Sequence, residues 1–551
     1  MSIQDRPDSI IQGRPGPISR RAFLGLGGAT AAALVLSGSP FAALGARVAN
    51  GQNLPETTGY GPLVAKPPVG GTEGADNILA LPAEFNYQVI DRQGLLQRDG
   101  NLTPGIFDAM GAFPDSGRTN EGSGDRTILI RNHENRERAG EIPVTVPDPY
   151  DPATIGGCTK LVVERRKLDR DPATDQQLYE YQVVDKFNII GGTSTNCAGG
   201  EVPFKKWITC EEVVKGPSNS PSTQRHGYNF EVDAMSDGPV EALPILAAGR
   251  FVHEATTWRA GVLYQTEDRS LQADPVRGTI GACFYRYTPD QRVGQSDNLA
   301  ETTGVLEAAM VKGQPNFNFD AVTTPGASFE IEWVTVDDPD HDDDTDNDRT
   351  RTPGRTPTRI QAQDKGAGFF DRMEGIWVEG AEGQGGSIFF DCTTGGPQNL
   401  GQVWKYDEGR EVLTLVFVST NRQQLENPDN ITIVQQTGDI FLCEDSPGEQ
   451  FIRGLTQEGE IYDFAQALTN DTEFCGAVFD PDRQTLYVNQ QGERGLEPLP
   501  ETPTEGPVDP RAAVTYAIYG PFEKRSGNSS RGNGPTTTGD GSGDSTTKSG
   551  R

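Results

Sequence analysis

A cysteine and two glutamates lie close together within two short polar runs of this chain. The first run is Asn196-Cys-Ala-Gly-Gly200 and the second is Trp207-Ile-Thr-Cys-Glu-Glu212. A thiolate is a soft metal ligand and a carboxylate is a hard one. The closeness of Cys197 to Glu211 or Glu212 therefore predicts a metal site that offers both soft and hard ligands. Because side chains alternate along a strand, we expect one glutamate to face the site and the other the opposite side.

Further acidic residues recur beside Gly, Asn or His at the ends of strand-like runs. Several carboxylates gathered at one place could not all stay ionised without cations, and calcium or ferric iron accepts such oxygens. The runs are Arg131-Asn-His-Glu-Asn135, Gly249-Arg-Phe-Val-His-Glu-Ala255 and Arg372-Met-Glu-Gly375, with Glu267-Asp268, Glu444-Asp445 and Glu473 as secondary candidates.

Each of these residues also has a simpler interpretation. Asn132 and His133 suit a strand-end turn, because Asn and His often satisfy the turn backbone. For His253 we favour a hydrogen-bonded structural histidine. Arg372 suits an ion pair with a neighbouring carboxylate. Of the secondary candidates, Glu444-Asp445 and Glu473 suit solvated strand ends.

The elements that must position these residues are strands. Runs rich in β-branched and aromatic residues, bounded by Gly, Pro, Asp and Asn, recur from about residue 82 to 520, for example Lys160–Glu164, Lys206–Cys210, Gln402–Tyr406 and Asp439–Cys443. The best helical candidate, Ile461–Leu468, is short. Many strands without alternating helices argue against a βαβ fold, and the size favours a β-propeller with long inserted loops over one sandwich or barrel.

The ends of the chain predict export. Arg20 and Arg21 precede an apolar, Gly- and Ala-rich run that is too short to span a membrane, which is the pattern of a twin-arginine (Tat) signal. We therefore divide the chain into a signal peptide (1–45), an irregular segment (46–80), a propeller (81–522) and a disordered Gly/Ser/Thr-rich tail (525–551). Within the propeller, an acidic insertion near 337–360 predicts a solvated loop rather than a calcium site.

Composition limits the partners of the chain. The formal net charge is −31 at pH 7, which argues against nucleic acid and anionic membranes. No CxxC occurs among the seven cysteines, so a zinc ribbon is not expected. An odd count leaves at least one sulfur unpaired, and we expect this to be Cys197, whereas Cys283, Cys392 and Cys443 lie in apolar runs typical of a core.

In their order along the chain, these motifs resemble the PhoX-type alkaline phosphatases. The resemblance covers roughly residues 80–495. It rests on the twin-arginine leader, Asn132-His-Glu134, Asn196-Cys-Ala-Gly-Gly200, Thr209-Cys-Glu-Glu212, Gly249-Arg-Phe-Val-His-Glu254, Glu374-Gly375, Pro428-Asp-Asn-Ile431, Cys443-Glu-Asp445 and Phe474-Cys-Gly-Ala477. It implies a six-bladed propeller with an iron–calcium cluster at the channel mouth. It also implies a periplasmic or extracellular hydrolase of small phosphate monoesters, which we expect to be a monomer exported by the Tat machinery.

The resemblance also implies roles for individual residues. Cys197 is the expected ligand of ferric iron. Arg372 is the expected catalytic residue that holds the substrate phosphate. The expected cluster ligands, bound to iron or calcium, are Glu254, Glu374, Glu211, Glu212, Glu134 and Asn132. Asn196 and Lys205 are expected to contact the substrate phosphate.

One stretch departs from the family pattern. Where the family has Thr-Pro-Trp-Gly-Thr, this chain has Val202-Pro-Phe-Lys-Lys206, and we expect its lysines beside the cluster to alter substrate preference. Two alternative functions remain at this stage: a non-catalytic, calcium-binding exported propeller, and a calcium-dependent lactonase or organophosphate hydrolase. The metal sites of such lactonases and organophosphate hydrolases contain no thiolate, so Cys197 distinguishes them from a PhoX-type phosphatase.

Overall fold

The computed structural model describes residues 59–525 except 73, 75, 116–124, 173, 296, 381–385 and 494–510. The predicted signal peptide and almost all of the predicted C-terminal tail lie outside these residues. In the part described, strands dominate, and the helical elements are only α2 (Thr358–Asp364) and the short 3-10 turns η1 (Leu246–Ala248) and η2 (Leu299–Glu301). No described helix is long and apolar enough to cross a membrane.

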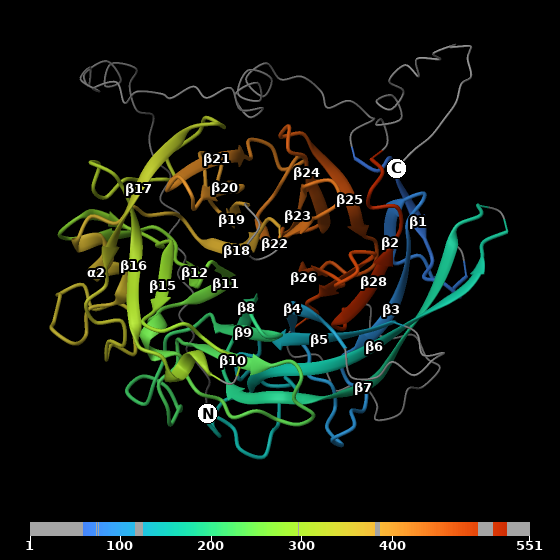
Figure 1. Cartoon of the computed structure of the whole chain (residues 1–551), viewed down its shortest axis with the longest axis horizontal. Helices are drawn as coiled ribbons and strands as arrows, with labels where there is room; N and C mark the ends of the chain where they lie inside the picture. Colours follow the sequence, from blue (N-terminus) through green and yellow to red (C-terminus); the bar gives the residue numbers. More distant parts are fainter. Residues whose placement is uncertain are drawn as a thin grey trace, which may run out of the picture. The chain divides into compact units, whose positions relative to one another are not determined.

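The strands form six antiparallel sheets, or blades, around a common centre. Their innermost strands are β4, β8, β11, β18, β22 and β26, and each contacts the next in this order, with β26 returning to β4. Looking along the shortest axis, Figure 1 shows these six strands surrounding the centre. The closed ring of contacts confirms the predicted six-bladed all-β propeller.

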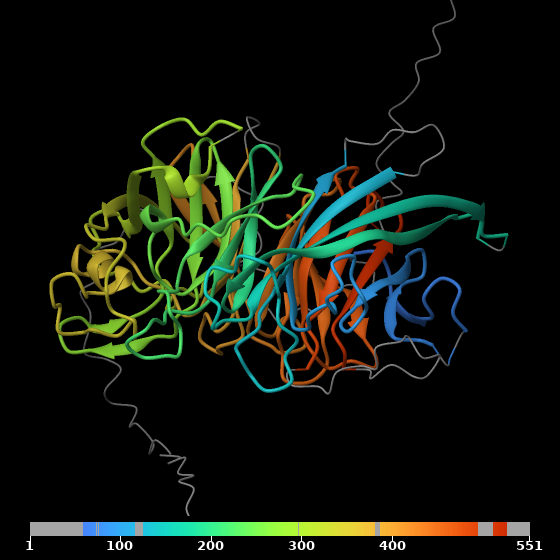
Figure 2. The ribbon, with the colours of Figure 1, turned by 90° about the horizontal axis from the view of Figure 1, so that it is seen from below.

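The first three blades follow one another along the chain. Blade 1 comprises β4 (Phe107–Pro114), β5 (Asp125–His133), β6 (Gly156–Arg170) and β7 (Gln177–Thr193). Blade 2 comprises β8 (Asn196–Val202), β9 (Lys206–Glu211) and β10 (Asn229–Asp233). Blade 3 comprises β11 (His253–Arg259), β12 (Val262–Glu267), β15 (Tyr285–Pro289) and β16 (Gly304–Val311), with β13 (Gln272–Asp274) and β14 (Gly278–Ile280) as a separate hairpin. Figure 2 shows the long β6–β7 hairpin, in teal, extending beyond its blade.

Blades 4 and 5 carry additional strands. Blade 4 comprises β18 (Met373–Val378), β19 (Ile388–Cys392), β20 (Gln402–Asp407) and β21 (Val412–Val418), and β17 (Ser328–Thr335) joins its outer edge to that of blade 3. Blade 5 comprises β22 (Pro428–Val434), β23 (Asp439–Glu444), β24 (Phe451–Leu455) and β25 (Ile461–Ala467), extended by β2 (Leu79–Pro82) and β1 (Leu63–Lys66). The predicted helix at Ile461–Leu468 is therefore wrong. The segment 46–80, predicted to be irregular, contains β1 and the start of β2.

Blade 6 closes the propeller with both ends of the domain. It comprises β26 (Phe474–Phe479), β27 (Thr485–Gln490), β28 (Val514–Tyr519) and β3 (Asn86–Arg92). The N-terminal strand β3 pairs with the C-terminal strand β28, for example Val89 opposite Tyr516. Buried aromatic and aliphatic side chains fill the spaces between neighbouring blades. This packing fixes the innermost strands relative to one another.

The acidic insertion differs from the sequence-based expectation of a solvated loop. Asp343, Asp344 and Asp346 are buried. The Asp344 carboxylate lies 2.7 Å from Nη2 of the buried Arg250, and Asp346 pairs with Arg269 and Arg359. Because each of these charges has a cationic partner, the aspartates can leave water. They brace the insertion against residues that lie just before β11 and just after β12 in blade 3.

Candidate metal centre at one end of the channel

Potential metal ligands occupy one equivalent position in all six blades. In each innermost strand the first residue pairs with the last residue of the second strand, and the register then shifts within a few residues. Such irregularities redirect side chains. The second residue of each innermost strand forms what we call the inner ring: Asp108, Cys197, Glu254, Glu374, Asp429 and Cys475.

A second set of six positions lies beside the first. The residue directly after the second strand of each blade forms the outer ring: Glu134, Glu212, Asp268, Thr393, Asp445 and Gln491. In every blade its backbone N–H donates to the carbonyl oxygen of the residue before the innermost strand, at 2.9–3.1 Å. This repeated hydrogen bond holds the outer ring against the start of the inner strands.

The residues that accept these hydrogen bonds are conformationally unusual. Ile106, Thr195, Arg372 and Asn427 each precede an innermost strand, and their φ angles lie between 49° and 52°. Non-glycine residues rarely adopt this left-handed conformation, and such strain is concentrated at functional sites. The same local geometry therefore recurs in at least four blades, and it places Arg372 at the edge of the rings.

The ring side chains converge on one another. Three groups of ligand atoms each lie within 4.8 Å of one another: Glu134 with Cys197 and Glu212; Glu254 with Glu374 and Asp429; and Asp429 with Asp445 and Glu473. The Cys197 Sγ also lies 3.4 Å from an oxygen of Glu254 and 3.5 Å from one of Asp108. The groups thus form one continuous cluster.

Two arginines border this cluster. The Nε and Nη2 of Arg372 donate to the two oxygens of Asp268 at 2.9 and 3.0 Å, and Nη2 also donates to Glu374 at 2.6 Å. On another side, Arg136 donates to Glu134 and, at 2.9 Å, to Glu212. Both arginine side chains remain partly exposed, at 30% and 37%. They reach from solvent to the cluster.

The negative charge of the cluster exceeds what these arginines balance. The two arginines face nine carboxyl groups: Asp108, Glu134, Glu212, Glu254, Asp268, Glu374, Asp429, Asp445 and Glu473. Burial and the neighbouring carboxylates raise the pKa of Glu254 and Glu374 well above their usual range. The Glu254 Oε2 is buried and makes no hydrogen bond within the described residues.

The chemistry of the donor set fits bound cations. Burial and the adjacent carboxylates, Asp108 first, raise the pKa of Cys197 well above the ordinary thiol value. Without cations, such a site would hold protons rather than charges. Polyvalent ions would instead allow the thiolate and carboxylates to be ionised together. An all-oxygen group such as Asp429, Asp445 and Glu473 suits calcium, and the group with Cys197 suits a transition metal.

Two predicted ligands have other partners. Glu211 lies outside the cluster: its oxygens accept hydrogen bonds from His226 Nδ1 at 2.7 Å and from the backbone N–H groups of Ser194, Gly227 and Tyr228. Glu212, by contrast, joins the Cys197 group. The Asn132 Nδ2 donates to the carbonyls of Cys197 and Ala198, and its Oδ1 accepts from Trp207. Asn132 and Glu211 thus orient the Cys197 segment.

The structure does not place the two predicted phosphate contacts in the cluster. The buried Asn196 amide accepts a hydrogen bond from Thr193, at the end of blade 1, and donates one to Thr209 in its own blade. Lys205 lies in the β8–β9 turn, at the other end of these strands, and its Nζ donates to the Pro114 carbonyl. Lys206 pairs with Glu231 at 2.6 Å. The expectation of lysines beside the cluster is therefore wrong, because a strand separates them from Cys197.

Sequence reasoning missed Asp108, Asp429 and Arg136. It treated Asp445 and Glu473 only as secondary candidates suited to solvated strand ends, yet both join a ligand group. A signal was present: Phe107-Asp108-Ala109 and Pro428-Asp429-Asn430 repeat the pattern of Asn196-Cys197-Ala198 and Met373-Glu374-Gly375. The pattern is too short to be recognised before the strands are aligned by their pairing.

The cysteines also depart from the usual pattern of exported proteins. All seven are free and buried. Cys283, Cys392 and Cys443 belong to hydrophobic core clusters, as predicted. Cys475 occupies the sixth inner-ring position, but its sulfur lies 3.0 Å from the Phe107 carbonyl oxygen. Cys197 is therefore the cysteine whose sulfur joins a group of potential ligands among the described residues.

Comparisons with known proteins agree with this architecture. The family model described as Alkaline phosphatase PhoX matches residues 58–493. The solved structure of Pseudomonas fluorescens PhoX in complex with vanadate, a transition state analogue, is similar with a TM-score of 0.57 and 15% identity, covering 84% of this chain and 98% of that one. A WD40 propeller domain of Doa1 covers 78% of this chain and 96% of its own, at 10% identity and a TM-score of 0.31. No curated protein matches the chain.

Proposed function

Because the chain belongs to the alkaline phosphatase PhoX family, we propose that it hydrolyses phosphate monoesters at the mouth of its propeller channel with the help of bound iron and calcium. The observation that carries this proposal is the cluster itself, in which nine carboxyl groups and Cys197 converge beside two partly exposed arginines. A strongly acidic protein can bind a phosphate ester only where cations outweigh its own charge.

The residues divide by the ions they would hold. Cys197 with Glu134, Glu212 and Glu254 supplies sulfur and oxygen for ferric iron, and Glu374, Asp429, Asp445 and Glu473 supply oxygen for calcium. When bound, such ions supply Lewis acidity toward the phosphoryl group and toward water. Asn132 would keep the Cys197 segment in place through its two backbone carbonyls.

Arg372 would bind the phosphoryl group. Its Nε and Nη2 are held by Asp268 and Glu374, whereas no hydrogen bond from Nη1 to another described residue occurs. The guanidinium is therefore oriented by two carboxylates and still offers N–H groups toward solvent. A fork of this kind suits two phosphoryl oxygens. Arg136, which is held by Glu134 and Glu212, would bind the phosphoryl group in a similar way.

Export through the Tat pathway to the periplasm or the outside of the cell completes the proposal. It rests on the Arg20-Arg21 leader. The alternative readings are less consistent with the cluster: a calcium-dependent lactonase or a purely calcium-binding propeller would give no role to a thiol placed 3.4 Å from Glu254.

The test compares p-nitrophenyl phosphate hydrolysis, metal content and the visible spectrum for matched variants. We expect Arg372→Ala to lower kcat/KM by roughly 10²–10³-fold, as for the loss of one donor to a transition-state anion, with metal content unchanged. Cys197→Ser should abolish any iron–thiolate absorption and the activity. Arg410→Ala removes an exposed arginine paired with Asp407 and serves as the control. Full activity in both site variants would refute the proposal.

A further inference from the structure

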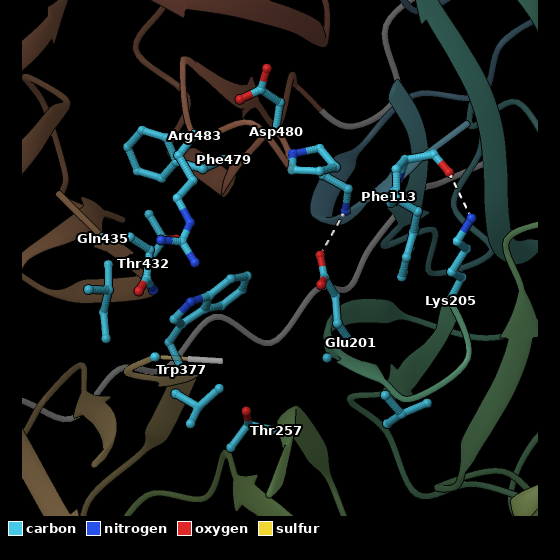
Figure 3. Close-up of a pocket in the computed structure, with 18 of the residues that line it drawn as sticks. Phe113, Glu201, Lys205, Thr257, Trp377, Thr432, Gln435, Phe479, Asp480 and Arg483 are labelled. Carbon is cyan, nitrogen blue, oxygen red and sulfur yellow. Dashed lines mark hydrogen bonds between the residues drawn. The ribbon is translucent and has the colours of Figure 1, made fainter. Parts of the chain in front are cut away.

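A cavity of about 400 Å³ lies at the opposite end of the innermost strands from the metal centre. Its walls come from the last residues of these strands, including Phe113 of β4, Thr257 of β11 and Phe479 of β26 (Figure 3). Phe113 lies five positions after Asp108 along β4, which corresponds to roughly 17 Å of extended strand. The cavity is therefore a separate site from the cluster.

The guanidinium of one arginine at this cavity makes no hydrogen bond or ion pair with another described residue. Arg483 lies in the turn between β26 and β27 and lines the cavity. The two nearby acids that could neutralise it, Asp480 and Asp482, instead accept from Arg165 at 2.8 and 3.1 Å. Figure 3 shows the Arg483 side chain extending toward Trp377. Because Asp480 and Asp482 form ion pairs with Arg165, the positive charge of Arg483 is available to a ligand.

Two cationic residues at this end adopt left-handed backbone conformations. The φ of Arg483 is 60°, and in the β8–β9 turn Phe204 and Lys205 have φ values of 68° and 60°. Glycine or asparagine ordinarily occupies such turn positions without strain. Lys205 also lines the cavity, and its Nζ is fixed on the Pro114 carbonyl. Strained residues of this kind are concentrated where a side chain is needed for binding.

The remaining walls combine aromatic surface with a few polar groups. Trp377, Phe113 and Phe479 supply flat apolar surface, and Thr257 and Gln435 supply polar atoms. The Glu201 carboxylate accepts from the Ala112 N–H at 2.9 Å. Glu201 is an exposed residue, so solvent screens its negative charge. Sites of this size and composition take small organic molecules.

We propose that this cavity is a second binding site, for a small organic anion that carries a flat aromatic ring. The anionic group, a carboxylate or a phosphoryl group, pairs with the Arg483 guanidinium, since Arg binds both in bidentate fashion. The ring lies against Trp377 and Phe113. The metal centre plays no part in this binding, so the site is independent of the proposed phosphatase activity.

The test uses the metal-loaded protein and fluorine NMR with three probes: 4-fluorobenzoate, 4-fluorophenylphosphonate and the neutral 4-fluorobenzyl alcohol. Inorganic phosphate at saturating concentration occupies the metal centre. We expect at least one anion to bind and the alcohol to bind at least tenfold more weakly. Binding of the carboxylate alone or the phosphonate alone supports the site and identifies the preferred anionic group.

Variants assign the binding to the cavity. Arg483→Gln, at an exposed turn position, should weaken anion binding at least tenfold, as should Trp377→Leu. Arg410→Gln, an exposed arginine outside the cavity, should leave it unchanged. The proposal fails if neither anion binds, or if Arg483→Gln and Arg410→Gln behave alike. The Arg483 variant keeps the test decisive even if Trp377→Leu fails to fold.

Discussion

Stripping the metal ions from this protein should make its stability fall as the pH rises, and Asp429 allows the effect to be estimated. Asp429 is 8% exposed and belongs to two of the three ligand groups. Burial and the nearby Asp445 raise its pKa from 3.8 to about 7. Between those two pH values the folded metal-free protein keeps a proton at Asp429 that the unfolded chain has already lost. The free energy of unfolding therefore decreases with rising pH in this window.

The magnitude follows from the pKa difference. A difference of about three pKa units corresponds to about 4 kcal/mol lost between pH 4 and pH 7 from this residue alone. Asp108, Glu212, Glu254 and Glu374 shift in the same direction, so the complete cluster should lose more. Bound ions remove the dependence, because they hold the carboxylates in their ionised form.

The assay is urea unfolding of metal-free and metal-loaded protein at intervals from pH 5 to pH 8. We expect the metal-free protein to lose several kcal/mol over this range, and Asp429→Asn to recover part of the loss. Asp407→Asn is the control, since Asp407 pairs with the exposed Arg410 away from the cluster. A metal-free protein equally stable at pH 5 and pH 8, or an Asp429→Asn variant with an unchanged pH dependence, would refute the reasoning.

Two further predictions separate structural from ligating residues. Glu211→Gln should lower the free energy of unfolding by about 2–3 kcal/mol, because the backbone N–H groups of Gly227 and Tyr228 and the His226 ring lose a charged acceptor. The metal content per folded molecule should stay unchanged. Glu212→Gln should instead lower the metal content with little loss of folding, and the reverse result would contradict the assignment. Gly476→Ala should destabilise the protein by at least about 2 kcal/mol, because φ is +64° and the new Cβ would lie 2.4 Å from the Asp108 carbonyl oxygen. Gly313→Ala, with φ +72° and open space around the Cβ position, is the matched control in denaturant unfolding, and equal losses in the two variants would show that the close approach is unimportant.

The class of fold could be predicted from local patterns, but the closure of the ring could not. Alternating apolar residues and turn residues identify most strands, because both are local signals. The pairing of β3 with β28 joins segments more than four hundred residues apart, and nothing in either segment specifies the other. The helix predicted at Ile461–Leu468 fails for a related reason. β25 is paired along both edges, by β24 and β2, and the adjacent residues Ile461 and Tyr462, which point to opposite faces, are both buried.

The candidate site divides in the same way. Cys197, Glu254 and Glu374 stand in distinctive motifs and were found. Asp108 stands in a run that looks like an ordinary strand start, and Asp429, although it lies in the Pro428-Asp-Asn-Ile431 motif, was not predicted to be a ligand. Lys205 was misplaced because it is eight residues from Cys197 in the sequence, although β8 carries the chain from one end of the channel to the other before it. Sequence proximity predicts spatial proximity across a turn but not along a strand, where each residue adds about 3.3 Å.

The candidate metal centre is best understood as a property of the repeat. Six blades supply the same two ring positions through the same hydrogen bond and the same irregular pairing, so the backbone offers a nearly symmetric set of twelve side chains. The asymmetry comes from the residues at these positions. Thr393 and Gln491 carry no charge, and the Cys475 sulfur lies against a carbonyl oxygen. Two arginines form ion pairs with carboxylates of blades 1–4 and neutralise part of their charge. Since these choices leave the backbone hydrogen bonds intact, substitutions at the ring positions can change which ions bind without changing the propeller that holds them.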